Sequence, residues 1–271
     1  MVKAKNIKIE IGGKIIMKTK SNRTVKGRPY VSTLLAIALV FALLTAMPLT
    51  ASADEDEAPA ATGSMSNFVR TRLYTPGIFT DVNENMWYGY EKEKAVMLAY
   101  EYELMSGNSA TTFNPTGNLT IAEAITVTTR IHSFYATGHQ VEFTPIPDAP
   151  WFQGNVNYAI ENGIIGASIF SDYRRTATRA EMAYIFAHAL PDTEYQERYD
   201  VNSPPDVNAS TPYYNEITML YRAGIVGGDG GTWAFRPADN ITRVEAAAII
   251  SRLVVVNTRL GYDYYYPGFT S

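Results

Sequence analysis

One short pattern occurs three times along the 271-residue chain and limits its fold more than any other feature. In each copy a threonine is followed three residues later by a glutamate, at the start of a segment with helical apolar spacing. The three copies are Thr120–Glu123, Thr178–Glu181 and Thr242–Glu245. Similarity at a fixed spacing of roughly sixty residues is typical of a repeat protein.

The pattern predicts the start of a helix in every copy. The threonine hydroxyl accepts a hydrogen bond from the backbone amide three residues on, and the glutamate reaches back to the threonine amide. Apolar residues then follow on one helical face, as at Met182, Ile185 and Phe186 of the second copy. The sequence therefore predicts three equivalent helices, each with one buried face.

The residues before each capped helix also agree. An aspartate precedes an aromatic pair, a short apolar-periodic stretch ends in a glycine-containing break, and a loop with a phenylalanine follows. The aspartates and the first aromatic residues are Asp81 with Trp87, Asp148 with Trp151, and Asp206 with Tyr213. Glycine suits the left-handed conformation that ends many helices. Each repeat is therefore predicted to be helix, loop, helix.

The N-terminus differs from the rest of the chain in charge. Residues 1–53 contain 9 of the 23 lysines and arginines and 1 of the 27 acids, which leaves the remainder with a net charge of 14 − 26 = −12. The basic start, the apolar run 31–47 and the small residues 51–53 predict a cleaved signal peptide over residues 1–53, with Met17 as a second candidate start. An uncleaved membrane anchor is the alternative.

The composition excludes several function classes. An acidic body is a poor match for nucleic-acid phosphates, which need clustered lysine and arginine. The absence of cysteine excludes disulfides, thiolate metal sites and a cysteine nucleophile. No glycine-rich phosphate loop, nucleophile elbow or zinc-protease motif occurs in the sequence. We therefore predict no catalytic residues, no metal, no cofactor and no nucleic-acid partner.

The repeats resemble the S-layer homology (SLH) domain family. The segments that match its pattern are Phe79–Val82, Trp87, Gly224–Gly227, Phe235–Pro237 and Thr178–Glu181. We place the repeats at 79–138, 139–200 and 201–256. They lie between an acidic, flexible linker at 54–78 and a tyrosine-rich tail at 257–271.

The resemblance implies a fold and a role. Three SLH repeats form a mainly α, pseudo-threefold helical prism, and grooves between repeats bind secondary cell-wall polysaccharide, often through a pyruvylated amino sugar. Such proteins attach without a covalent bond to the Gram-positive envelope. We thus expect a secreted protein at the cell wall or surface layer, with no membrane contact after signal cleavage. Its expected partners are the peptidoglycan-linked glycan and, as further candidates, other surface proteins.

By this resemblance Arg179 and Arg243 are the residues expected to bind the ligand. Each follows the capping threonine, beside the helix dipole and unpaired amides, which suits a carboxylate. Sugar stacking is expected from Trp87 and Trp151. The residues expected to accept hydrogen bonds from sugar hydroxyls are Asp81, Asp148 and Asp206.

For the same residues, structural roles are the alternative interpretation. The arginines can bridge acids of the neighbouring repeat, the tryptophans can anchor the core, and the aspartates can cap the first helices. The capping threonines and glutamates are expected to be structural. Ile121 stands where the family has arginine. One groove is therefore expected to lack its anion contact and to be inactive or purely structural.

The sequence favours a binding module without enzyme activity. A surface-layer protein that self-assembles is one alternative, and a component that hydrolyses wall glycans is another. Both need a domain for which the repeats leave no room, which weighs against them.

Overall fold

The computed structural model describes residues 10–11, 14–15, 63–198 and 200–261. In the N-terminal unit, strand β1 (Glu10–Ile11) pairs antiparallel with β2 (Lys14–Ile15). The remainder of the predicted signal peptide, with Met17 and the apolar run, lies outside the described residues. None of the described helices has the length and apolar character needed to cross a membrane.

Six α-helices form most of the regular structure in residues 63–198 and 200–261, which confirms the predicted helical class. The first helices of the repeats are α2 (Ala95–Glu101), α4 (Gln153–Glu161) and α6 (Tyr214–Arg222). The second helices are α3 (Ile121–Thr137), α5 (Arg179–Ala187) and α7 (Arg243–Val254). Three short 3-10 helices are η1 (Met65–Asn67), η2 (Asp192–Glu194) and η3 (Val256–Thr258).

Each second helix begins with a complete capping box. At α5 the Glu181 amide donates to Thr178 Oγ1 at 3.2 Å, and the Thr178 amide donates to Glu181 Oε2 at 2.9 Å. The same reciprocal pair is present at Thr120 and Thr242. Replacing such a cap typically costs about 1 kcal/mol, because a terminal amide loses its acceptor.

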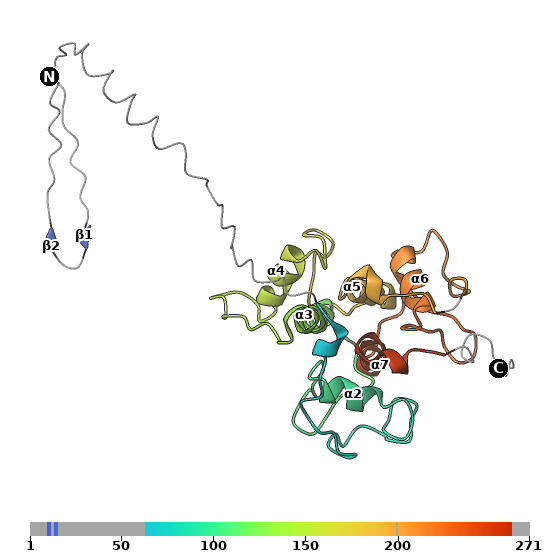
Figure 1. Ribbon diagram of the computed structural model, residues 1–271. Helices are drawn as coiled ribbons and strands as arrows, with labels where there is room; N and C mark the ends of the chain where they lie inside the picture. The colour runs from blue at the N-terminus through green and yellow to red at the C-terminus, as the bar shows by residue number, and fades with distance from the viewer. Residues whose placement is uncertain (1–9, 12–13, 16–62, 199, 262–271) are drawn as a thin grey trace, which may run out of the picture. The chain divides into compact units, whose positions relative to one another are not determined.

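The helices pair across repeats rather than within them. The first helix of each repeat packs against the second helix of the preceding repeat, α4 on α3 and α6 on α5. The first helix of the chain, α2, packs on the last, α7, and so closes the cycle. Figure 1 shows α3, α5 and α7 grouped in the middle, with α2, α4 and α6 around them. Each packed pair of helices therefore comes from two different repeats.

A ring of backbone hydrogen bonds joins the segments just before the three second helices. The Leu119 amide donates to the Ile241 carbonyl at 3.0 Å, Ile241 to Ala177 at 3.1 Å, and Ala177 to Leu119 at 2.8 Å. All three side chains are fully buried. The three repeats thus meet in cyclic order, and their chain segments are tied at one place.

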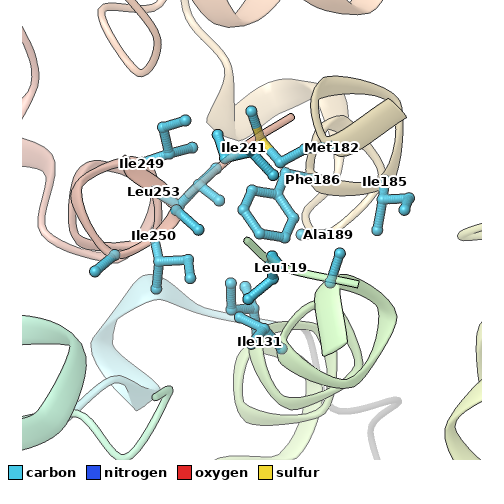
Figure 2. Close-up of a cluster of buried hydrophobic side chains, with 14 of the residues drawn as sticks. Leu119, Ile131, Met182, Ile185, Phe186, Ala189, Ile241, Ile249, Ile250 and Leu253 are labelled. Carbon is cyan, nitrogen blue, oxygen red and sulfur yellow. The ribbon is translucent and has the colours of Figure 1, made fainter. Parts of the chain in front are cut away.

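The core lies between the three second helices. Figure 2 shows side chains from α3, α5 and α7 converging there, including Ile131, Phe186 and Leu253. Each is fully buried. Burying one such side chain contributes about 1.5–3 kcal/mol, so this shared core is a main source of stability.

Part of the predicted linker belongs to the folded body, which corrects the flexible boundary at residue 78. Phe68 and Tyr74 are buried in the core, and the Ser64 amide donates to the Tyr135 carbonyl at 2.9 Å. Aromatic residues in the described part of this segment give it apolar surface to bury. At the other end, Arg259 is buried as well, so the first residues of the predicted tail also pack on the repeats.

Candidate functional site

Two grooves open at the boundaries between repeats. The first, groove A, has a volume of about 410 Å³ and is lined mainly by Ser106, Gly107, Glu123, Arg130, Trp151 and Arg243. The second, groove B, has a volume of about 480 Å³ and is lined mainly by Trp87, Arg179, Gly228, Glu245, Ala248 and Arg252. Each groove receives residues from all three repeats.

The two grooves are built from equivalent positions. In each, the helix that supplies the capping glutamate also supplies an arginine seven residues later, Arg130 in groove A and Arg252 in groove B. The next repeat in the cycle contributes a tryptophan, and the remaining repeat contributes the arginine of the Thr-Arg pattern. Sequence reasoning missed Arg130 and Arg252, although their equal spacing from the capping glutamates could have indicated them.

Arg179 is almost buried, with 5% of its surface exposed, and it has several partners within the protein. Its Nε donates to the Phe235 carbonyl at 2.5 Å, and Nη1 donates to Glu245 Oε1 at 2.9 Å. The guanidinium also lies 4.8 Å from the centre of the Phe235 ring, a favourable cation–π distance. The guanidinium is thus held in one orientation at the wall of groove B.

Arg243 repeats this arrangement in groove A. Its Nε donates to the Phe113 carbonyl and Nη2 to the Ser106 carbonyl, both at 2.9 Å. Nη1 lies 3.7 Å from Glu123 Oε1. Both arginines therefore contact an acid of the neighbouring repeat, as one alternative foresaw, and both also line a groove.

The expectation that the first amides of α5 and α7 are unpaired is wrong. The amides of Arg179 and Ala180 donate to the carbonyls of Asp239 and Pro237, at 2.8 and 3.0 Å. Those of Arg243 and Val244 are bonded to carbonyls in the same way. The loop of a neighbouring repeat occupies the N-terminus of each helix, so these amides are not open to a ligand.

Burial and neighbouring charges shift the pKa values of the residues in these ion pairs in opposite directions. Burial raises the pKa of Glu245, but Arg179 and the hydrogen bonds from Thr242 lower it more, so the pKa lies below its ordinary value. Burial lowers the pKa of Arg243, which the charge of Glu123 partly offsets.

Trp87 and Trp151 lie at the surface of the grooves. Their exposed fractions are 40% and 66%, so neither is a core anchor. Phe152, which follows Trp151, is buried in the core instead. Its ring meets the Trp151 ring edge-on, with 5.5 Å between the ring centres. Exposed indole rings beside a fixed arginine offer a flat apolar surface to a ligand.

Two of the three aspartates hold the phenylalanine loops. The Asp206 carboxylate accepts the amides of Phe235 and Arg236, both at 2.7 Å, and Asp81 makes the equivalent pair of bonds. Asp81 and Asp206 therefore do not cap the first helices, as the alternative interpretation would require. The N-caps of α2 and α6 are Lys94 and Tyr213. Asp148 is exposed and makes no such bonds to the described residues.

The third boundary is closed. Ile121 is fully buried where the other two helices start with arginine, and Arg175 pairs with Glu181 instead, at 2.5 Å. The rings of Tyr184 and Tyr213 lie 4.8 Å apart, across the space that corresponds to the other grooves. At this boundary a buried isoleucine therefore stands where the other two boundaries have the arginine.

Metal-ligating residues do not gather anywhere in the described part of the chain. His132 lies on α3, where its Nδ1 is 2.8 Å from the hydroxyl of Tyr158 on α4 and burial lowers its pKa.

Comparison with known proteins agrees with this architecture. Residues 78–125 and 205–247 match the family model described as S-layer homology domain. The chain contains S-layer homology domains. These matches cover the first repeat up to the start of α3 and the third repeat up to the start of α7, and they include Trp87, Gly228 and Glu245 of groove B.

Three relatives extend the comparison. The chain is 28% identical to an endoglucanase of Bacillus sp. (strain KSM-635), over 65% of this chain and 18% of the relative. It is 28% identical to the surface-layer 125 kDa protein of Lysinibacillus sphaericus, over 61% of this chain and 14% of the relative. It is 27% identical to an amylopullulanase of Thermoanaerobacterium thermosulfurigenes, over 65% and 9%. The chain thus spans less than a fifth of each relative.

Proposed function

We propose that this protein is a cell-surface anchoring module that binds secondary cell-wall polysaccharide in grooves A and B. The observation that supports this most directly is the recurrence of one lining in both grooves: a fixed arginine, an exposed tryptophan and a capping glutamate, each from a different repeat.

The chemistry of the grooves suits an acidic sugar. The exposed faces of Trp87 and Trp151 can pack against the apolar face of a sugar ring. Arginine forms strong, directional hydrogen bonds with carboxylates, which fits a pyruvate ketal. Because Arg179 and Arg243 are held by backbone carbonyls, they lose little side-chain entropy when a ligand binds.

The relatives support a role as an attached module. Two of them are named as enzymes and one as a surface-layer protein, and this chain is similar to a small part of each. We propose that the shared part is not the catalytic one, and that this chain binds glycan without cleaving it. We further propose export through the predicted signal peptide at residues 1–53 and attachment to a Gram-positive wall.

Co-sedimentation of the full chain with purified Gram-positive sacculi tests the proposal. We expect binding to sacculi and its loss after acid extraction of the secondary polysaccharide. The double variant Trp87→Ala/Trp151→Ala is expected to bind at least tenfold more weakly. Tyr213→Ala is the matched control, because it removes the aromatic residue at the closed third boundary.

The design separates ligand contact from folding. The tryptophans are exposed, so their loss leaves the core intact, and thermal unfolding of each variant checks this. Binding that survives both extraction and the double substitution would refute the groove mechanism.

A further inference from the structure

A second cavity adjoins groove A and shares Thr126, Arg130 and Trp151 with it. This cavity, here called the side pocket, has a volume of about 410 Å³ and is lined mainly by Thr129, Arg130, Gln140, Phe143, Trp151 and Asn155. Trp151 and Arg130 line groove A as well. One exposed ring and one arginine thus border two adjacent cavities.

The outer wall of the side pocket is the segment between α3 and α4, and several contacts fix it. The Val141 amide donates to Ser133 Oγ at 3.2 Å. The Phe143 ring packs edge-on against Tyr158, 6.0 Å away. Phe143 also lies so close to Gly154 that a Cβ there would come within 2.7 Å of its ring. The glycine lets this segment lie directly against α4, so the pocket is formed before any ligand arrives.

Arg130 differs from its counterpart in groove B. Arg252 donates to Glu93 Oε2 at 2.5 Å, so its charge is compensated. Arg130 donates to the Leu104 carbonyl at 3.0 Å but makes no ion pair with a carboxylate in residues 63–198 or 200–261. Its Nε is buried without a hydrogen-bond partner among these residues. A buried donor without an acceptor is costly, so the position of Arg130 carries a local cost in stability.

The side pocket itself suits a neutral ligand. Its charged lining residues are Arg130 and Glu142, which balance, and the amide side chains of Gln140 and Asn155 offer both donors and acceptors. In groove A, by contrast, Arg130 and Arg243 face the single carboxylate of Glu123. Arg243 therefore adds positive charge to groove A, the amide side chains lie in the side pocket, and Arg130 lines both cavities.

We propose that groove A binds two consecutive sugar residues, an acidic residue against Arg130 and Arg243 and a neutral residue in the side pocket. Trp151 separates the two subsites and packs against the glycan at their junction. This inference rests on the proposed function. Groove B also adjoins a second cavity, of about 820 Å³, with which it shares Glu93 and Arg252, but Trp87 does not line that cavity and Arg252 is paired with Glu93.

Titration calorimetry with sized fragments tests the second subsite. The probes are the single acidic sugar and the acidic–neutral disaccharide, both prepared by hydrolysis of polysaccharide extracted from the sacculi. The full chain is used with Trp87→Ala, so that groove A dominates the signal. We expect the disaccharide to bind about tenfold more tightly than the single sugar.

The decisive variant is Gln140→Ala/Asn155→Ala in the same background. It should abolish the tenfold gain for the disaccharide and leave binding of the single sugar unchanged. Asn157→Ala is the matched control, since Asn157 is exposed on the same helix and does not line the pocket.

The outcomes distinguish this inference from the proposed function. A disaccharide that binds no more tightly than the single sugar, or a gain that survives Gln140→Ala/Asn155→Ala, overturns the second subsite and leaves wall binding intact. If the chain binds neither the fragments nor the whole polysaccharide, both proposals are refuted.

Discussion

Replacing Asp206 with asparagine tests how the arginine-bearing grooves are held. Both carboxylate oxygens of Asp206 accept backbone amides, from Phe235 and Arg236, at 2.7 Å. Asparagine keeps one acceptor and turns an NH₂ donor toward the other amide. A hydrogen bond to a charged acceptor contributes about 1.5–3 kcal/mol, and the solvent exposure of Asp206 lowers this value. We expect the free energy of unfolding to fall by about 1–2 kcal/mol.

The repeats supply the controls for this experiment. Asp81→Asn should cost about the same, because Asp81 accepts the amides of Phe113 and Asn114 at 2.8 and 2.7 Å. Asp148→Asn should change stability by less than about 0.5 kcal/mol, since Asp148 is an exposed residue outside such a network. Urea unfolding followed by far-UV circular dichroism measures all three. Equal losses at the three positions, or no loss at Asp81 and Asp206, would refute this account.

Three further predictions follow from single positions. Glu103 has φ +57° where the other repeats have glycine, so Glu103→Gly should stabilise the fold by up to about 1 kcal/mol in urea unfolding, and a loss of stability would contradict this. Since Tyr184 and Tyr213 fill the third boundary, calorimetry of the unmodified chain with the single acidic sugar should give two sites per chain, and three sites would contradict it. Because the pKa of Glu245 is lowered in the folded state, its contribution to stability is present above about pH 4.5 and is lost as the pH falls below that value. Glu245→Gln should therefore weaken the acid dependence of unfolding between pH 5 and about pH 3, and an unchanged dependence would count against this role.

Local features of the fold could be predicted from the sequence. The capping boxes at Thr120, Thr178 and Thr242 are made within four residues, so their side-chain types and spacing are sufficient to place three helix starts. The same holds for the left-handed conformations of Gly163 and Gly224 at the ends of α4 and α6.

Contacts between repeats could not be predicted in the same way. The sequence shows that Arg179 follows a helix cap, but not that the carbonyl of Phe235, 56 residues later, accepts from its Nε. Similarly, Asp148 and Asp206 both precede an aromatic pair in the sequence, but of these two only Asp206 accepts the backbone amides of a phenylalanine loop. Such contacts depend on the cyclic packing, which no single repeat encodes.

The cyclic packing also explains why the three boundaries differ. Each boundary joins two repeats of the ring, in which α2 packs on α7 and the segments before the second helices exchange backbone hydrogen bonds. Two boundaries are closed by arginines that also line a groove, and these leave room for a ligand beside an exposed tryptophan.

The third boundary is closed by the contact between the tilted rings of Tyr184 and Tyr213 and by the Arg175–Glu181 ion pair. Those contacts fill the space in which a ligand would lie, so they hold the ring together without offering a site. The departure at Ile121 is thus accompanied by different contacts at this boundary, where Ile121 and Tyr213 stand in place of the arginine and the tryptophan of the other two.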